Sequence, residues 1–280
     1  MLPHPNRVKR AMRHVDRAGA GLRAAVRILL LLAWTFLLFV QQLLGLLLRT
    51  GDGRHIRCRF YRGALRILGV RMMVRGQFSP RRPLLIASNH VSYLDIFVLG
   101  SRIPGVFISK DDVQQWPVIG WIARLQNTIF VSRKPGQARH ELNPIVAHLT
   151  LGHNVFLFPE GTSTDGRQLL PFKSSLFEAA IQGGAYVQPV ALVYRHRHGG
   201  PLSLKERALY TWGTDAPFLT HFVKMLLRPG VACEIWVRPE IPPTSPRKTL
   251  AQLTQTRIAA PLRHREHLDL LGLQHADSGR

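Results

Sequence analysis

The stretch PLLIASNHVSYLD, residues 83–95, decides how the rest of the chain is interpreted. Its first half is an apolar run with the length of a buried strand, and its second half carries Asn89, His90, Ser92 and Asp95. A buried strand that ends in polar side chains and passes into a helix is typical of the carboxyl edge of a parallel sheet, where α/β proteins hold their ligands. The stretch therefore predicts an α/β fold with a functional site at this edge.

The rest of the chain repeats this alternation of short apolar runs and helix-length stretches. The predicted strands are 83–88, 105–109, 128–132, 154–158, 187–194 and 232–237. The predicted helices are 92–100, 111–125, 137–151 and 173–184. Strands at this spacing with helical crossovers favour a largely parallel sheet flanked by helices. Residues 195–215 are predicted to be rich in loops, and a linker over 242–248 leads into a final helix over 249–264.

Length and composition limit the class of protein. The chain has 280 residues, enough for one large domain or for one domain with an appendage. Its 38 Lys and Arg residues against 16 Asp and Glu residues give a net charge of +22. This excess predicts a polyanionic neighbour, either nucleic acid or an anionic membrane surface. The two cysteines, Cys58 and Cys233, make no disulfide framework and are expected to be free thiols.

Residues 28–48 decide between these two polyanions, because they contain 21 residues without a charge. Such a run is long enough to cross a bilayer core as a helix. It is too long for the apolar part of a signal peptide and more uniformly apolar than most buried core helices. Basic residues are dense on both sides of it and prefer the cytoplasmic side. The sequence therefore predicts a helical membrane anchor of re-entrant or hairpin form that bends near Gln41-Gln42 or Gly45.

Residues 54–70 continue this anchor with a basic amphipathic pattern. Ile56 and Phe60 fall on one helical face, whereas Arg59 and Arg62 fall on another. A helix of this kind can lie in the headgroup layer, where each basic side chain near an anionic leaflet contributes about 1 kcal/mol. The alternative is a helix that packs on the main domain with a solvated basic face. Because the apolar run adjoins it, the interfacial helix is the preferred interpretation.

His90 and Asp95 are the first candidates for chemistry. They are five residues apart across the start of a helix, where neighbouring turns bring two side chains together. Imidazole takes a proton near neutral pH, and a carboxylate on its other nitrogen fixes the tautomer and stabilises the cation that forms. The chain has no G-x-S-x-G turn, so the pair is expected to activate a hydroxyl that the substrate brings. An ordinary helix-start cap beside an imidazole explains the same spacing, and a metal site is disfavoured because further ligands are missing.

Two more polar clusters follow predicted strands, and each leaves an alternative open. Arg133 follows the strand 128–132, where its guanidinium can bind a phosphate with two parallel hydrogen bonds or can be one solvated arginine among many. Glu160 follows the strand 154–158 on a turn that a proline and a glycine force. That turn can orient a hydroxyl or offer N–H groups to an anion, and it can equally be a plain tight turn.

Taken in order, four segments resemble the glycerophospholipid acyltransferase family, typified by the 1-acylglycerol-3-phosphate (lysophosphatidate) acyltransferases. The segments that carry the resemblance are NHVSYLD (89–95), NTIFVSR (127–133), FPEGT (158–162) and VQPVAL (187–192). Their order and spacing match the family over about residues 83–195. The resemblance implies an enzyme that moves a fatty acyl group from acyl-CoA or acyl-acyl carrier protein to the hydroxyl of a lysolipid.

The resemblance also implies the role of each matching residue. His90 is the general base that deprotonates the acceptor hydroxyl, and Asp95 orients it. Arg133 binds the acceptor's phosphate or another anionic head group, and Lys110 helps to stabilise the oxyanion. The acceptor site is shaped by Glu160, Gly161 and Thr162. No cofactor and no metal ion is implied beyond the acyl donor as co-substrate.

Three departures from the family's pattern bear on the acceptor. Asn127 stands where the second segment usually has glycine, Ser163 where many lysophosphatidate enzymes have arginine, and Gln188 at a position that is often apolar. The favoured acceptor is 1-acylglycerol-3-phosphate. Relatives that acylate lyso-ornithine lipid look similar through NHVSYLDI, SKDDVQQWPVIGW and PFKSSLFEAA, and this acceptor is the alternative. A non-enzymatic basic protein that binds membrane or nucleic acid is the alternative of another class, although no zinc-finger, RNA-recognition or basic-zipper pattern supports it.

The expected organisation follows from these assignments. Residues 1–27 form a basic cytoplasmic N-terminus, 28–82 the membrane anchor and interfacial helix, 83–241 the acyltransferase domain, and 242–280 a linker, helix and tail. The expected partners are membrane lipids and acyl-CoA or acyl carrier protein, with no nucleic acid. The expected location is a membrane, the bacterial inner membrane, with the active site on its cytoplasmic side.

Overall fold

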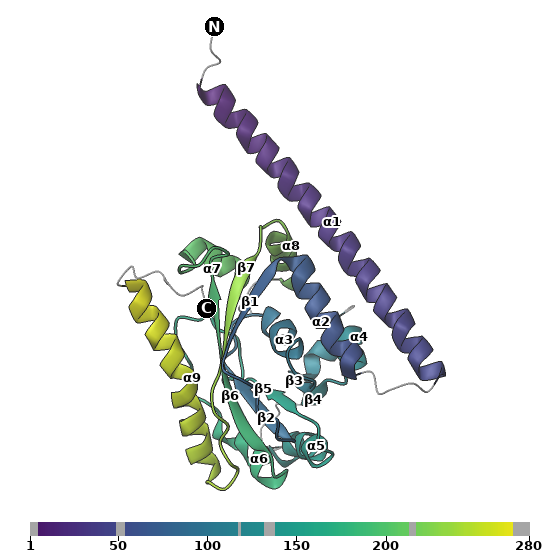
Figure 1. The fold of residues 1–280 in the computed structure, drawn as a ribbon, viewed down its shortest axis with the longest axis vertical. Helices are drawn as coiled ribbons and strands as arrows, with labels where there is room; N and C mark the ends of the chain where they lie inside the picture. Colours follow the sequence, from purple (N-terminus) through teal and green to yellow (C-terminus); the bar gives the residue numbers. More distant parts are fainter. Residues whose placement is uncertain (1–4, 49–53, 117–118, 132–137, 213–216, 271–280) are drawn as a thin grey trace.

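The computed structural model describes residues 5–48, 54–116, 119–131, 138–212 and 217–270. These residues build a seven-stranded sheet with helices on both faces (Figure 1). In chain order the strands are β1 (Val70–Arg75), β2 (Leu84–Ser88), β3 (Val106–Lys110), β4 (Ile129–Val131), β5 (Val155–Leu157), β6 (Tyr186–Arg195) and β7 (Val231–Val237). Across the sheet their order is β1-β7-β6-β2-β5-β3-β4.

The sheet is mostly parallel, as the sequence predicted. Neighbouring strands run parallel except β6 and β7, which are antiparallel. β2 lies at the centre between β6 and β5, and all five of its residues, LLIAS, are buried. A central strand covered on both faces needs such a continuous apolar run rather than an alternating one. The carboxyl end of β2 therefore opens directly into the polar loop that begins at Asn89.

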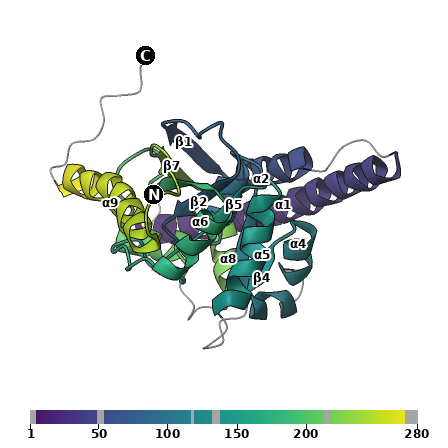
Figure 2. The same cartoon turned by 90° about the horizontal axis from the view of Figure 1, so that it is seen from below.

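The helices divide between the two faces of the sheet (Figures 1 and 2). One hydrophobic core lies under α1 (Pro5–Leu47), α2 (Arg54–Leu68), α3 (Leu94–Gly100), α7 (Leu204–Tyr210) and α8 (Phe218–Leu226). The other lies under α5 (Ala138–Thr150), α6 (Glu178–Gln182) and α9 (Arg247–Leu270). α4 (Ile119–Leu125) stands beyond β3 and β4, near the far end of α1. Two short 3-10 turns complete the order, Asp111–Gln115 before α4 and Ser174–Phe177 before α6.

The bend that was predicted within the apolar run 28–48 is wrong, because this run lies in one helix up to Leu47. α1 continues without interruption through Gln41, Gln42 and Gly45, because glycine in a helix costs only about 1 kcal/mol relative to alanine and does not stop it. The chain instead reverses between the end of α1 and the start of α2. The two helices then lie antiparallel, with Trp34 Nε1 donating a hydrogen bond to the Phe60 carbonyl oxygen at 3.2 Å.

Three further elements were missed in the sequence. β1 lies inside the segment assigned to the anchor and pairs in parallel with β7, so the sheet begins before residue 83. Its sequence, VRMMVR, is short and does not alternate regularly between apolar and polar residues. Gly69, at φ +77°, separates it from α2. α7 lies within residues 195–215, which were predicted to be rich in loops, and α8 lies after them, where no element was predicted. α7 begins at a capping box, in which Ser203 and Glu206 bond each other's backbone N–H.

The remaining boundaries agree with the prediction to within a few residues, with differences in three helices. The predicted helix 111–125 contains a 3-10 turn followed by the shorter α4, and the predicted helix 173–184 likewise opens with a 3-10 turn before α6. The final helix is longer than predicted, running over Arg247–Leu270. Cys58 and Cys233 are buried free thiols, as expected.

Candidate active site

His90 and Asp95 meet at the carboxyl end of β2. His90 Nδ1 donates a hydrogen bond to Asp95 Oδ2 at 2.8 Å, and the Asp95 side chain is fully buried while 20% of the His90 side chain remains exposed. The His90 ring also stacks on Phe158, with ring centroids 4.0 Å apart and planes 15° apart. The imidazole is therefore held on one edge by a carboxylate and on one face by an aromatic ring. Because Asp95 occupies Nδ1, the other ring nitrogen, Nε2, is the one available to a substrate.

The Asp95 carboxylate is surrounded by donors. Oδ2 also accepts the backbone N–H groups of Val91 at 2.8 Å and Ser92 at 2.9 Å, and Oδ1 accepts the Tyr194 hydroxyl at 2.8 Å. A buried carboxylate requires such partners to stay ionised. Burial raises the pKa of the Tyr194 phenol well above its ordinary value, and the neighbouring Asp95 adds to that rise, so the phenol stays a donor. Tyr194, at the end of β6, is a site residue that the sequence did not reveal.

Glu160 connects two loops of the site. Its Oε1 accepts the backbone N–H of His90 at 2.8 Å, and its Oε2 accepts the backbone N–H of Leu170 at 2.9 Å. The Thr164 N–H in turn donates to the His90 carbonyl oxygen at 2.9 Å. Burial raises the pKa of Glu160, although the two backbone N–H bonds act against that rise. The predicted clusters after β2 and β5 are thus brought together, with Glu160 holding the backbone of His90.

The turn after Glu160 is shaped by its glycine. Gly161 adopts φ +75°, and a Cβ there would lie 2.6 Å from the ammonium nitrogen of Lys173. Only glycine takes this conformation at low cost and leaves room for that ammonium. Thr162 is partly buried, and its hydroxyl lies 3.5 Å from the Ser163 carbonyl oxygen. Lys173, in the segment PFKSSLFEAA, is therefore a cation beside the turn that received no individual role from the sequence.

The three departures from the family's pattern each have a structural explanation. Asn127 adopts φ +56°, the left-handed conformation that glycine favours and asparagine tolerates best among other residues. The buried Gln188 accepts the Ser79 N–H at 2.9 Å and donates to the Arg238 carbonyl oxygen, so its polar group is satisfied. Ser163 Oγ donates to the Trp212 carbonyl oxygen at 2.6 Å. Ser163 thus joins the turn to the loop after α7, whereas an arginine at position 163 would present a cation.

Two predicted binding residues are not placed by the structure. Arg133 lies outside the described residues. Lys110 is the last residue of β3 and pairs with Val131 of β4, and only its backbone is described. Among the described residues, no group of three or more His, Cys, Asp or Glu side chains is placed to hold a metal ion.

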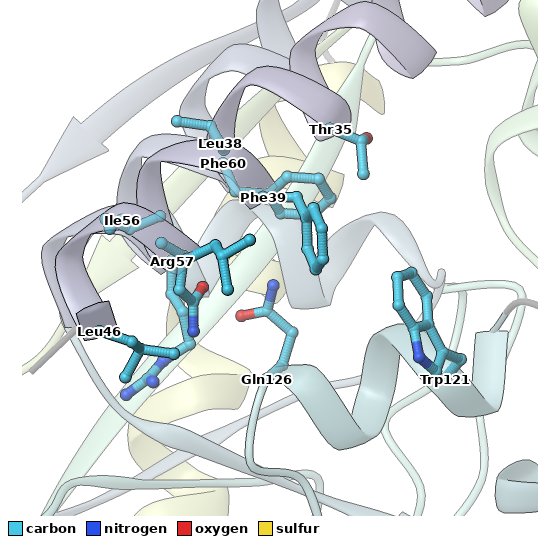
Figure 3. A pocket seen from close by; sticks show the side chains of 11 residues that line it. Thr35, Leu38, Phe39, Leu46, Ile56, Arg57, Phe60, Trp121 and Gln126 are labelled. Carbon is cyan, nitrogen blue, oxygen red and sulfur yellow. The ribbon is translucent and has the colours of Figure 1, made fainter.

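An apolar hollow of about 130 Å³ lies between α1, α2 and α4 (Figure 3). Leu38 and Phe39 reach it from α1, Phe60 from α2 and Trp121 from α4, and the Phe39 and Trp121 ring centroids are 6.3 Å apart. Gln126 is a polar member of the lining, and its buried Oε1 has no hydrogen-bond partner among the described residues. A lining of this composition suits an apolar chain more than a polar ligand.

Comparison with known proteins decides the family. The profile of the family described as Acyltransferase matches residues 71–193. A lyso-ornithine lipid O-acyltransferase of Rhizobium meliloti is 39% identical over 212 residues, which are 73% of this chain and 73% of that protein. The chain belongs to the acyltransferase family. This acyltransferase is also 40% identical over 141 residues to a 1-acyl-sn-glycerol-3-phosphate acyltransferase of Neisseria gonorrhoeae, covering 49% of this chain and 55% of that protein.

A solved structure has the same fold as this acyltransferase. The crystal structure of the 1-acyl-sn-glycerophosphate (LPA) acyltransferase from Thermotoga maritima superposes with a TM-score of 0.62, covering 87% of this chain and 98% of that chain at 19% identity. The resemblance, the α/β fold and the enzyme class predicted from the sequence are confirmed. The non-enzymatic alternative is thereby set aside.

Proposed function

We propose that this acyltransferase moves a fatty acyl group from a thioester to the hydroxyl of a lysolipid, with His90 as general base. The observation that carries the proposal is the 2.8 Å hydrogen bond between His90 Nδ1 and Asp95 Oδ2. It leaves Nε2 of a half-buried imidazole to receive a proton. It also places a buried carboxylate where the resulting positive charge needs stabilisation.

The reaction then proceeds without a covalent enzyme intermediate. The acceptor O–H gives its proton to His90 Nε2 while its oxygen attacks the thioester carbonyl carbon. The tetrahedral intermediate collapses, the C–S bond breaks, and the leaving thiolate takes the proton back from the imidazolium. We propose that Lys110 stabilises the oxyanion, and that Arg133, Gly161 and Thr162 contribute to the acceptor site. Glu160 acts through the backbone of His90 and so positions it.

For the acceptor we propose lyso-ornithine lipid. The relative that covers 73% of the chain carries that name, and a second one from Brucella abortus is 37% identical over 231 residues, or 78% of this chain. Ser163 also bonds the Trp212 carbonyl oxygen at the position where many lysophosphatidate enzymes have arginine. 1-Acylglycerol-3-phosphate is the second candidate, because the Neisseria relative carries that activity in its name and Arg133 is retained.

For the donor we propose acyl-CoA or acyl-acyl carrier protein, with no further cofactor. Both present the same thioester, and both are anionic, as suits a chain of net charge +22. The apolar hollow between α1, α2 and α4 is proposed to receive an acyl tail. Its lining by Leu38, Phe39, Phe60 and Trp121 supports that assignment.

The chain associates with membrane, and we propose the cytoplasmic face of the bacterial inner membrane as its location. In the part of the chain that the structure describes, one helix, over Ala18–Leu47, is long and apolar enough to cross a bilayer, and few of its residues are buried within the fold. Its leucines therefore need an apolar environment outside the protein. The domain division at residues 27 and 241 also stays a proposal, whereas the pairing of β1 with β7 puts the start of the sheet before the predicted division at residue 82.

The test compares acyl transfer by purified membranes that contain the parent protein, His90→Ala or His264→Ala, with each acceptor supplied separately. Loss of a general base is expected to lower the rate by about 10²–10⁴-fold. The His264→Ala control removes an exposed imidazole on α9 and is expected to leave the rate unchanged. Equal rates in the parent and His90→Ala would contradict the mechanism. A preference of the parent for 1-acylglycerol-3-phosphate would contradict the proposed acceptor and leave the mechanism standing.

A further inference from the structure

α8 presents an exposed surface that the proposed reaction does not use. The helix buries His221, Met225 and Leu226 against the domain. Leu219 and Val223, one turn apart, point outward, with 69% and 41% of these residues exposed. Large apolar side chains gathered on one exposed helical face mark a contact with another molecule or with a membrane.

Positive charge borders this apolar face. Lys224 and Arg228 are exposed on α8 and just after it, and together with Lys205 of α7 they line an open hollow of about 420 Å³ between the two helices. None of the described residues that line the hollow is acidic. A helix with apolar side chains beside lysine and arginine has the composition of one that lies at the boundary between lipid headgroups and acyl chains.

α8 also adjoins the helix that is proposed to enter the membrane. Arg23 Nη1 of α1 donates to the Leu227 carbonyl oxygen at 3.0 Å, and Arg27 Nη1 donates to the Leu226 carbonyl oxygen at 2.9 Å. α1 and α8 are seen side by side in Figure 1. On the same part of α1, Leu22 and Leu29 are 68% and 66% exposed. A bilayer that receives these leucines is therefore within reach of α8.

We propose that α8 is a second membrane contact of this acyltransferase. Leu219 and Val223 enter the headgroup–acyl boundary, and Lys205, Lys224 and Arg228 bind the phosphates of an anionic leaflet. The proposal rests on the proposed function, in which α1 is the anchor. The proposed contact also connects the bilayer to the loop that carries His90. Tyr93, three residues after His90, has its hydroxyl 3.1 Å from His221 Nδ1 of α8.

The proposal is tested with an environment-sensitive fluorophore on single introduced cysteines in the full chain, since Cys58 and Cys233 are both buried. The three positions are Leu219→Cys on α8, Leu37→Cys on α1, and Leu253→Cys, a 40% exposed leucine on α9 across the sheet. Vesicles of phosphatidylglycerol and phosphatidylethanolamine carry a nitroxide near the headgroup. The emission of the labels at 219 and 37 is expected to shift to the blue and to be quenched by the nitroxide. The label at 253 is expected to show neither change.

The outcomes separate this proposal from the anchor. Loss of emission at 37 without loss at 219 overturns the α8 contact and leaves the anchor intact, whereas no loss at either position overturns both. Equal loss of emission at 219 and 253 also overturns the proposal, because it shows that the protein binds vesicles without turning α8 towards the bilayer. A change at 219 caused by soluble acyl carrier protein in the absence of vesicles assigns the surface to a protein and likewise overturns it.

A charge variant supplies a second measurement. Replacing Lys224 and Arg228 together by alanine is expected to weaken vesicle binding by about fivefold for each cation removed, because each contributes about 1 kcal/mol near an anionic leaflet. The effect is expected to vanish in phosphatidylcholine vesicles. The matched control replaces Arg247 and Lys248, which are exposed on α9, and is expected to change binding less. Equal losses in the two double variants contradict the proposal.

Discussion

Asp95 is the residue around which the site is arranged. Two backbone N–H groups and the His90 imidazole bond one of its carboxylate oxygens, and the Tyr194 hydroxyl bonds the other. The resulting order of contacts runs outward from the sheet interior, from Tyr194 through Asp95 to the partly exposed His90. Tyr194 is thus a positioning residue, because it acts on His90 only through the carboxylate.

Removing the Tyr194 hydroxyl is expected to change the pH dependence of the rate. In Tyr194→Phe, Asp95 Oδ1 loses its donor, and the carboxylate attracts the imidazolium proton more strongly. The acidic limb of the pH–rate profile is therefore expected to move to higher pH, with a loss of about tenfold at neutral pH, since a hydrogen bond to a charged group contributes about 1.5–3 kcal/mol. Tyr186→Phe, on the same strand, is the control. An unmoved limb in Tyr194→Phe would show that the hydroxyl serves only packing.

Glu160 is expected to make stability depend on pH in an identifiable direction. Burial raises its pKa in the folded state, so the folded chain holds this proton more tightly than the unfolded chain. Its contribution to the free energy of unfolding is fully present below the ordinary pKa of 4.5 and is lost as pH rises through the raised value. Denaturant unfolding at a series of pH values is expected to show this decline in the parent and not in Glu160→Gln.

Glu206 offers a control of the opposite sign for that experiment. Hydrogen bonds from Ser203 lower the pKa of this exposed carboxylate below its ordinary value. Its contribution is present above pH 4.5 and is lost as pH falls through the lowered pKa. Glu206→Gln is therefore expected to flatten the pH dependence on the acidic side only. If the free energy of unfolding of Glu160→Gln still declines as pH rises, the decline belongs to another group.

At the scale of elements, the α1–α2 hairpin is joined by close packing as well as by polar contacts. Gly63 of α2 lies against the Trp34 indole of α1, where a Cβ would come within 2.2 Å of the ring. Farther along the pair, Arg59 Nη1 donates to Gln41 Oε1 at 3.0 Å. The small residue lets the two helices approach closely and fixes which turn of α2 faces Trp34.

A methyl group at position 63 is expected to disrupt this contact. Gly63→Ala forces the Trp34 ring away from α2, at a cost of about 1–3 kcal/mol for overpacking. Hydrogen–deuterium exchange over residues 54–68 is expected to become faster. Gly21→Ala is the control within α1, where a Cβ meets nothing within 4 Å and replacing helical glycine stabilises by about 0.5–1 kcal/mol. Equal exchange in Gly63→Ala and the parent would show that the hairpin does not depend on this approach.

At the scale of the whole molecule, α1 is bound to the domain along much of its length. Arg27 donates to carbonyl oxygens at and just after the end of α8, and Trp34 donates to that of Phe60. We therefore expect α1 to enter one leaflet with its outward leucines and not to cross the bilayer. Because α2 returns antiparallel to α1, we expect the sheet and the candidate site to lie on the side of the membrane from which α1 begins.

This arrangement predicts the accessibility of both ends of the hairpin. Cysteines introduced at Gly19 and His55, both exposed, are expected to remain unlabelled when a membrane-impermeant maleimide is added to intact cells. Both are expected to react after detergent solubilisation. The parent protein, with two buried thiols, gives the background. Labelling of position 55 in intact cells would mean that α1 crosses the membrane.

The sequence alone determined the class of fold and the contact at the centre of the candidate site. Alternating apolar runs and helix-length segments predicted the sheet, and the interval from His90 to Asp95 predicted their contact. Both are local properties, because they depend on residues within one strand or on one turn. Glu160 was identified in the sequence because it belongs to FPEGT, one of the segments that resemble the family. Its contact with the His90 backbone was not predicted.

Only the tertiary structure decided the features that join distant parts of the chain. Tyr194 reaches Asp95 across 99 positions of sequence, and β1 joins β7 although some 160 residues separate them. The reversal after α1 and the exposed face of α8 also belong to this group. Such contacts follow from the order of strands across the sheet and from the packing of helices on it. No local periodicity encodes that order, because the free energy of burying a residue depends on what the fold brings against it.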